Sequence, residues 1–384
     1  MNIAKHIDDS ELGERLRIAR NSSGLTQEDV ATVLDVARTT LVAIERGKRR
    51  VRSEELIKLA DLYNVTVNDL VRPTAIHVDL AARFRRLPTK SDSSAHEREA
   101  VALLTKLATS SLELETLLGY PTDRFYPPAR PISSGDITIQ AEDIALALRH
   151  RLGLGLAPIA DIVSLMELEL GVRVFVYPIK GAISGVYAFD KKVGACILLN
   201  AAQPNVRRIF SAGHELGHFM SVRDLVDVYN DEATYQDRDE VFANAFAASF
   251  LMPATAVRER FREFVDSEGK FSTRHLIILA NVFHVSMEAL CRRLEALSLV
   301  PRKTYEALRA KGLSASLARE AMREEPRKVV QDTSPRLTFL AIEALERGLM
   351  SEGQICDILG IDRLDIRELL NIYGAGVDDG AELA

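Results

Sequence analysis

SAGHELGHF, residues 211–219, holds His214, Glu215 and His218 in the order HExxH. On an α-helix, residues i and i+4 lie on one face, so both imidazoles can bind a single ion. Zinc suits them, because it accepts neutral imidazole nitrogen at about 2.0–2.1 Å. Glu215 follows the first ligand on a neighbouring face, where its carboxylate can take a proton from water that the ion has acidified. A catalytic zinc has three protein ligands and one open position, so a third ligand is expected elsewhere in the chain.

An alternative interpretation is that the two histidines form part of the polar surface of an ordinary helix. Histidine is scarce in this chain, with 8 in 384 residues, so a chance match to the motif is uncommon. The surface interpretation also leaves Gly213 and Gly217 unexplained, because glycine costs about 1 kcal/mol in a helix interior. Gly217 predicts that another backbone passes close to the motif, which favours the metal site.

The third ligand is expected from DRDEVFANAFAASFLMP, residues 237–253, a predicted helix that ends at a proline. Phenylalanines recur every four residues on one side of this helix, and Glu240 and Asn244 lie one turn apart on another. Asp237, Asp239 and Glu240 are all candidates for the carboxylate ligand. Asn244 either orients Glu240 or caps local backbone.

Length and composition limit the class of protein. A chain of 384 residues with 47% hydrophobic residues can form two or three domains with real cores. The formal net charge of −6 provides no overall basic field for nucleic acid. No apolar run of about 18 residues predicts a membrane span, and the N-terminal stretch lacks the apolar core of a signal peptide. Three scattered cysteines, at positions 196, 291 and 356, fit a reduced compartment, so a cytoplasmic protein is expected.

Residues 1–72 are predicted to form a separate all-helical domain. Five short helices are expected between residues 10 and 72, with the second opened by TQED, residues 26–29, and the third closed by Gly47. Two short helices joined by a tight turn and followed by supporting helices are typical of a helix-turn-helix.

LTQEDVATVL and VARTTLVAIERGKR closely resemble the Xre-type, phage-repressor-like helix-turn-helix domain. The resemblance implies that the third helix lies in the major groove of double-stranded DNA, with Arg38, Thr39 and Thr40 facing base edges. It also implies that Gln27, at the start of the second helix, contacts the DNA backbone. Ala37 departs from the pattern, because many members carry a serine there as the helix cap.

Basic residues cluster just after the predicted recognition helix, at Arg46, Lys48, Arg49, Arg50 and Arg52. Phosphate contacts of this kind position a DNA-binding domain. The alternative is a solvated loop, but the place of the cluster favours phosphate contact. A homodimer is expected, because one small helix-turn-helix reads too few base pairs for tight specificity.

Residues 73–135 are predicted to be a connector. Leucine and alanine recur at helical spacing over residues 95–120, and residues 120–135 are rich in proline and serine and lack a period. This second segment is predicted to be a domain linker, and it is also a candidate for cleavage by the chain itself.

A second domain is predicted over residues 136–300. Two helices are followed by three strand candidates, VRVFVYPI (172–179), ISGVYAFD (183–190) and GACILLN (194–200), whose short connections favour an antiparallel arrangement. A small sheet beside an HExxH helix is the zincin plan, in which a strand edge can bind an extended peptide. The predicted fold class is mainly α with a small antiparallel β-sheet (α+β).

AGHELGHF, the ExxANxFAxxFLMP pattern and LANVFHVSMEALCRRLEALSL (279–299) resemble the ImmA/IrrE family of zinc metallopeptidases. The resemblance implies a Zn²⁺ ion held by His214, His218 and Glu240, with Glu215 as the catalytic base. It also implies action on an Xre-type repressor, by cleavage or by displacement from DNA. Weaker polar candidates are Tyr229 and Tyr235 for oxyanion stabilisation, with surface packing as the alternative, and His275 and His284.

Residues 301–384 are predicted to be helical. SEGQICDILGIDRLDIRELL, residues 351–370, resembles a second helix-turn-helix fragment and is interpreted as an interaction or packing module.

Together these features predict a cytoplasmic transcriptional regulator that binds operator DNA and carries a zinc metallopeptidase domain. That domain would sense or cleave a peptide or protein signal. An alternative is a zinc endopeptidase whose helix-turn-helix recognises a partner repressor or antitoxin. An antitoxin-like role is a third hypothesis.

Overall fold

The computed structural model describes residues 8–63, 65, 67–71, 80, 95–121, 124–223, 227–230, 238–311 and 334–373. The chain divides into two compact units. Unit 1 comprises residues 1–123, 190–193 and 339–384, and unit 2 comprises residues 124–189 and 194–338.

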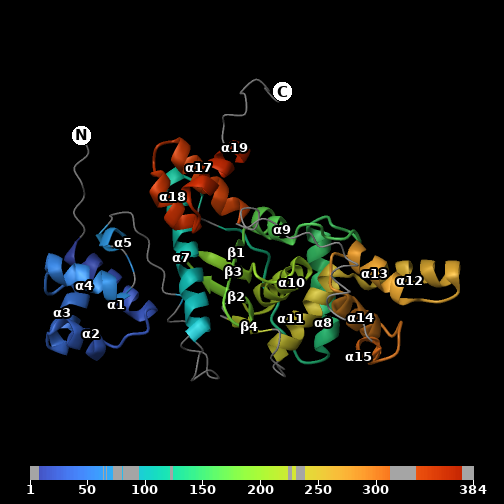
Figure 1. The fold of residues 1–384 in the computed structure, drawn as a ribbon. Coiled ribbons are helices and arrows are strands. Elements are labelled where there is room, and N and C mark those ends of the chain that lie inside the picture. Colours follow the sequence, from blue (N-terminus) through green and yellow to red (C-terminus); the bar gives the residue numbers. More distant parts are fainter. Residues whose placement is uncertain are drawn as a thin grey trace. The chain divides into compact units, whose positions relative to one another are not determined.

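The N-terminal segment from α1 to α5, called the head below, contains the five predicted helices (Figure 1). They are α1 (Asp9–Ser22), α2 (Gln27–Leu34), α3 (Arg38–Glu45), α4 (Ser53–Tyr63) and α5 (Val67–Val71). Thr26 opens α2 with the predicted capping box, in which Asp29 occupies the reciprocal position. The head has its own core, with Leu16, Leu41 and Leu59 completely buried. These helices therefore form a domain with a hydrophobic core of its own.

The remaining helices of unit 1 come from two distant parts of the sequence. One is the long helix α7 (Ala95–Leu118), and the others are α18 (Glu352–Leu359) and α19 (Arg363–Tyr373). The helix α17 (Pro335–Glu346) precedes them, and Glu343 on it accepts a hydrogen bond from the Tyr120 hydroxyl at 2.9 Å. The described parts of the C-terminal region, residues 301–311 and 334–373, are mainly helical, as predicted.

Unit 2 is built around a four-stranded sheet in the order β1-β3-β2-β4. Its strands are β1 (Arg173–Tyr177), β2 (Ile183–Asp190), β3 (Gly194–Asn200) and β4 (Asp227–Asn230). The α+β class is confirmed, but the expectation of a wholly antiparallel sheet is wrong. β1 and β3 pair in parallel, whereas β2 and β4 pair antiparallel.

The physical reason for this mixed sheet lies in the connection between β1 and β2. Its five residues, 178–182, can span roughly 16 Å when extended, which exceeds the roughly 10 Å needed to step across two strand positions. The connection is thus long enough for β2 to lie two places from β1, and the chain returns through residues 191–193 to insert β3 between them.

The helices of unit 2 form layers beside this sheet. α10 (Asn205–Ser221) lies against β3, α11 (Arg238–Leu251) lies against α10, and α8 (Ile137–Arg151) lies against α11 (Figure 1). The other helices are α9 (Ile162–Leu168), α12 (Ala254–Glu268), α13 (Thr273–Val282), α14 (Met287–Ala296) and α15 (Thr304–Ala310).

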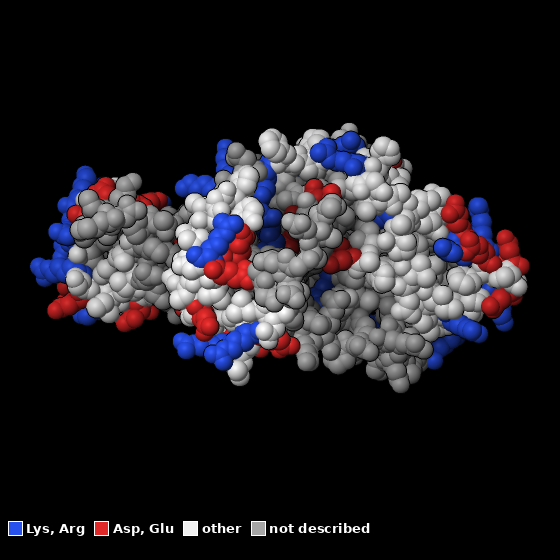
Figure 2. All heavy atoms as spheres, turned by 90° about the horizontal axis from the view of Figure 1, so that it is seen from above, with Lys and Arg blue, Asp and Glu red and all other residues white. Residues whose placement is uncertain are grey.

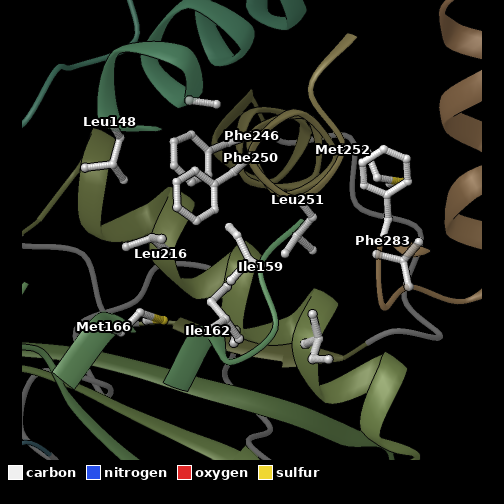
Figure 3. Packing of buried hydrophobic residues seen from close by; sticks show 14 of the residues in the cluster. Leu148, Ile159, Ile162, Met166, Leu216, Phe246, Phe250, Leu251, Met252 and Phe283 are labelled. Atoms are coloured by element: carbon white, nitrogen blue, oxygen red, sulfur yellow. The ribbon is translucent and has the colours of Figure 1, made fainter. Parts of the chain in front are cut away.

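The phenylalanine stripe of α11 forms the centre of this core. Phe246 and Phe250 stack with ring centroids 5.5 Å apart and point toward Leu148 of α8 (Figure 3). Leu216 of α10 enters the same cluster. Because α11 buries one stripe against α8, its opposite side is free to meet α10.

Two buried arginines hold the C-terminal end of α11. Arg149 of α8 donates to the Phe250 carbonyl at 2.6 Å, and Arg293 of α14 donates to the Met252 carbonyl at 3.0 Å. Cations complement the partial negative charge at a helix C-terminus. Arg293 also pairs with Glu142 at 2.9 Å, so neighbouring helices fix the position of α11 along its axis.

Residues 124–135, part of the predicted linker, pack on unit 2 and are called the strap below. The Tyr126 hydroxyl accepts a hydrogen bond from the Ala195 amide of β3 at 3.0 Å. The Arg130 amide donates to the Met220 carbonyl at 2.8 Å, and Arg238 donates to the Ser133 carbonyl at 3.0 Å. The strap therefore connects the end of α10 with the start of α11.

No single helix among the described residues is long and apolar enough to cross a membrane. α11 and α12 meet that test of length and composition only together, as a pair bent by 55°.

Candidate metal centre and helix-turn-helix

α10 places the HExxH residues in a fully enclosed position. His214, Glu215 and His218 have no exposed surface, and the helix is buried continuously from Ser211 to Ser221. Gly217 explains how a second helix approaches so closely, because a Cβ there would lie 2.9 Å from the Ala243 Cα atom of α11. The prediction that another backbone passes close to this glycine is confirmed.

This approach brings Glu240 of α11 to the two imidazoles. The Nε2 atoms of His214 and His218 are 3.1 Å apart. The Glu240 carboxylate oxygens lie 3.5 Å from His214 Nε2 and 3.4 Å from His218 Nε2. A tetrahedral ion with ligand bonds of about 2.0–2.1 Å has ligand atoms about 3.3 Å apart. The donor set and its spacing therefore fit a single zinc-sized ion.

The other acidic candidates do not join this group. Within the described part of the chain, His214, His218 and Glu240 form the one cluster of three or more His, Cys, Asp or Glu side chains with metal-binding spacing. Asp239 is half-buried and outside it, and Asp237 lies outside the described residues.

Asn244 contacts a histidine of the cluster. Its Oδ1 atom lies 3.1 Å from His214 Nδ1, so that Nδ1 can donate and Nε2 is left to face the ion. Of the two roles left open for Asn244, the contact supports an orienting role, but the residue oriented is His214 and not Glu240.

The electrostatic surroundings keep His214 neutral. Burial and the neighbouring His218 lower the pKa of the His214 imidazole to about 3, although Glu240 and Asn244 act in the opposite direction. Neutral imidazole is the form that ligates a metal ion, so the site favours the ligating form.

The Glu215 carboxylate lies beside Gly185 of β2. A Cβ atom on Gly185 would lie 2.5 Å from the Glu215 Oε1 atom, so the carboxylate occupies space that only glycine leaves free. The ladder between β2 and β4 has an irregularity between Ile183 and Gly185, beside this contact. Bulges of this type often re-aim groups next to active sites.

The two weaker histidine candidates do not belong to the cluster. His275 is buried, stacks on Phe264 and lies 2.9 Å from a Glu268 carboxylate oxygen, and His284 is exposed. The Tyr229 backbone belongs to β4, whereas its side chain and Tyr235 lie outside what the structure describes.

In the head, a chain of polar contacts links α1, α2 and α3. Arg20 and Glu45 form a buried ion pair at 2.5 Å, and Glu45 also accepts from Gln27 at 2.8 Å. Gln27 in turn accepts from Arg38 at 3.4 Å. Glu45 is therefore a structural residue that holds the start of α2 against α3, and Gln27, Arg38 and Arg20 line a common pocket.

The predicted DNA-contacting side chains differ in exposure. Arg38 and Thr39 are exposed at the start of α3 and Thr40 is half-buried, while Arg46, Lys48 and Arg50 are exposed beyond its end. Arg49 is different, because its guanidinium donates to both carboxylate oxygens of Glu55, at 2.8 and 3.0 Å. Figure 2 shows Lys and Arg side chains along the outer edge of the head, with acidic side chains between them.

Two family models match the chain. One describes a helix-turn-helix domain and matches residues 11–72, and the other describes an IrrE N-terminal-like domain of a peptidase family and matches residues 168–295. The chain therefore combines a segment that matches a helix-turn-helix domain with a segment that matches an IrrE N-terminal-like peptidase domain. The two resemblances inferred from the sequence are thereby confirmed.

Three of the similar curated proteins are helix-turn-helix regulators. The regulator ImmR of Bacillus subtilis is 38% identical over 60 residues, which cover 16% of this chain and 47% of ImmR. The regulator DdrOP3 of Deinococcus deserti is 35% identical over 72 residues, or 19% of this chain and 56% of DdrOP3. The chain thus spans about half the length of these relatives. MJ0272 of Methanocaldococcus jannaschii, a helix-turn-helix regulator, is 38% identical over 56 residues, or 15% of this chain and 85% of that protein.

A solved structure, ComR from Streptococcus suis, aligns over 96% of both chains with 11% identity and a TM-score of 0.16. These values are too low to indicate a shared fold.

The ImmA/IrrE-type domain also contains a site residue that the sequence did not reveal. Gly185 lies in a strand, 30 positions before Glu215, and no motif connects the two. The one available signal was a glycine within a β-branched and aromatic strand, which often marks a bulge or a close approach.

Proposed function

We propose that this protein is a DNA-binding transcriptional regulator whose ImmA/IrrE-type domain holds Zn²⁺ and hydrolyses a peptide bond in a peptide or protein signal. The enzymatic part of this proposal rests on one observation: the donor atoms of His214, His218 and Glu240 lie 3.1–3.5 Å from one another. These three residues would hold the ion, and one tetrahedral position would stay open. Cytoplasmic location and a homodimeric state are part of the same proposal.

Each side chain of the centre has a separate task. When bound, the ion supplies Lewis-acid polarisation of the scissile carbonyl and acidifies the attacking water. Glu215 would take the proton from that water and pass it to the leaving amide nitrogen. Asn244 would hold His214 in the tautomer whose Nε2 faces the ion, and Gly185 would leave room for the Glu215 carboxylate. Burial of all three HExxH side chains keeps bulk water from competing with these contacts.

Metal content and peptide cleavage, measured together, test the enzymatic part of the proposal. Purified full-length protein should contain one zinc ion per chain by mass spectrometry of metals, and Glu240→Ala should lose it. Glu215→Gln should keep the zinc but lose cleavage of a helix-turn-helix regulator offered as substrate. If Glu215→Gln cleaves as fast as the unchanged protein, the hydrolytic role is wrong.

The DNA-binding half rests on the head. Arg38, Thr39 and Thr40 would face base edges, and Gln27 would contact the DNA backbone. The exposed cations after α3 would contact phosphates, namely Arg46, Lys48, Arg50 and Arg52. Arg38→Ala should reduce affinity for a fragment of the protein's own promoter by about 5- to 150-fold, as expected for a base contact worth 1–3 kcal/mol, and reduce discrimination against unrelated DNA. Fluorescence anisotropy at several salt concentrations measures both effects. Unchanged affinity and discrimination would contradict this assignment.

A further inference from the structure

The C-terminal helices α18 and α19 repeat the spacing of α2 and α3. Ser351 opens α18 with a capping box, as Thr26 opens α2, and both helices have eight residues. Each ends at a residue in the left-handed region, Gly360 with φ 65° and Asp35 with φ 54°. In both pairs the next helix begins three residues later, at an arginine.

The buried positions of the two pairs also correspond. Ile355 and Leu359 of α18 occupy the positions of Val30 and Leu34 in α2. Ile366 and Leu369 of α19 occupy the positions of Leu41 and Ile44 in α3, and each of these eight side chains is at most 8% exposed. α18 and α19 therefore form a second helix-turn-helix in geometry as well as in pattern.

The second helix-turn-helix keeps an arginine, Arg363, at the position of Arg38 but has fewer of the cations that bind DNA phosphates. Glu352 stands at the position of Gln27, and an acid there repels phosphate. Five basic residues follow α3 between positions 46 and 52, whereas residues 371–384 contain neither lysine nor arginine. Affinity for DNA depends on cations that neutralise phosphates, so this motif is unsuited to a nucleic-acid partner.

The outer face of α19 instead suits a protein surface. Leu364, at the position of Thr39, is 73% exposed. It begins an exposed stripe at helical spacing that continues through Arg367, Glu368 and Asn371. One apolar side chain beside one cation and one anion makes this stripe neutral. In an antiparallel pairing of two identical stripes, Arg367 of each copy faces Glu368 of the other, which is the self-complementarity that a two-fold interface requires.

We propose that α19 is a self-association surface, on which the stripe Leu364–Arg367–Glu368–Asn371 pairs with the same stripe of a second copy. This inference rests on the proposed function, because helix-turn-helix heads bind two half-sites as dimers. A contact made by one helix from each copy lies at the small end of specific interfaces, below about 1,200 Å², so a dissociation constant in the micromolar range is expected.

Sedimentation equilibrium of the full chain, without DNA or added metal, tests the proposal. Leu364→Glu should raise the dimer dissociation constant by at least tenfold. The matched control is Leu168→Glu, since Leu168 is also a helical leucine and is 74% exposed. The control should dimerise like the unchanged protein. Circular dichroism of each variant confirms that it is folded.

Charge reversal tests the pairing itself. Arg367→Glu and Glu368→Arg should each weaken the dimer, and the double variant should restore it. The proposal is overturned if the unchanged protein is monomeric throughout, if Leu364→Glu dimerises as tightly as Leu168→Glu, or if the double variant is no tighter than the single ones. Zinc content and promoter binding are measured on the same samples, so failure of the proposed function is distinguished from failure of the interface.

Discussion

Asn244 Oδ1 lies 3.1 Å from the Nδ1 atom of His214, and this contact is expected to leave Nε2 facing the donor triangle. Asn244→Ala should lower zinc affinity by about 10- to 100-fold, because the ring loses the partner that fixes its tautomer and orientation. Asn244→Asp keeps an acceptor in place and should retain affinity near that of the unchanged protein. Competition with a chromogenic chelator measures both values. Equal affinities for the alanine variant and the unchanged protein would show that Asn244 does not position the ligand.

Gly185 is expected to act on the proposed base, Glu215, and not on the metal site. In Gly185→Ala the new Cβ would lie 2.5 Å from the Glu215 Oε1 atom, so the carboxylate must move. A shift of about 1 Å in a catalytic group can cost about 100-fold in rate, so cleavage should fall by that order while zinc content stays at one per chain. Gly353→Ala is a suitable control, because a Cβ there meets no atom within 4 Å. Loss of zinc in Gly185→Ala would mean that the glycine serves the fold and not the base.

At the scale of elements, a buried carboxyl holds the start of α17. Glu167 of α9 accepts hydrogen bonds from the Ser334 hydroxyl at 2.7 Å and the Arg336 amide at 3.2 Å. Burial raises the pKa of Glu167 from 4.5 to about 7, although these hydrogen bonds act in the opposite direction. The folded protein therefore favours the neutral Glu167 carboxyl below about pH 7.

The sign of the resulting pH dependence follows from that raised pKa. Between pH 4.5 and about 7 the folded protein binds more protons at Glu167 than the unfolded chain does. The contribution of Glu167 to folding stability is therefore complete below pH 4.5 and is lost as the pH rises through 7. Urea unfolding should show that the free energy of unfolding falls over this pH range by an amount on the order of 1–3 kcal/mol because of Glu167. Glu167→Gln should abolish this fall. The control is the pH profile of Asp161→Asn, an exposed acid at the start of the same helix. A Glu167→Gln profile parallel to that of the unchanged protein would contradict the assignment.

Elements defined by local patterns were predictable, whereas their non-local pairing was not. The capping box at Thr26 and the phenylalanine stripe of α11 follow from residue types a few positions apart. The parallel pairing of β1 with β3 depends on which strand fills the place next to β1, and the short connections do not determine that choice. Asn244 meets His214 instead of Glu240 because of how α11 crosses α10, and Arg49 is held by Glu55 because of how α4 begins. Such contacts depend on the distances between separate elements, and the spacing of residues within one element does not predict those distances.

At the scale of the whole molecule, DNA binding by a dimer would add the contacts of two heads. Arg46, Lys48, Arg50 and Arg52 are exposed beside α3, whereas both donors of the Arg49 fork are directed to Glu55. Each cation that neutralises a phosphate contributes about −0.9 to the slope of log affinity against log salt, so four per head predict a slope of about −7 for a dimer.

Arg50 and Arg49 should therefore differ in their effect on this slope, although they are adjacent and carry the same charge. Arg50→Ala should make the slope less steep by about 2, one contact for each head, and weaken binding to all sequences similarly. Arg49→Ala should change the slope little, because its guanidinium is already paired; its cost should appear in the thermal stability of the head, through loss of the Glu55 contact. Fluorescence titrations at four salt concentrations measure the slopes, and calorimetry measures the stability. If Arg49→Ala reduces the slope as much as Arg50→Ala does, Arg49 leaves Glu55 to bind phosphate, and the ion pair must open when DNA binds.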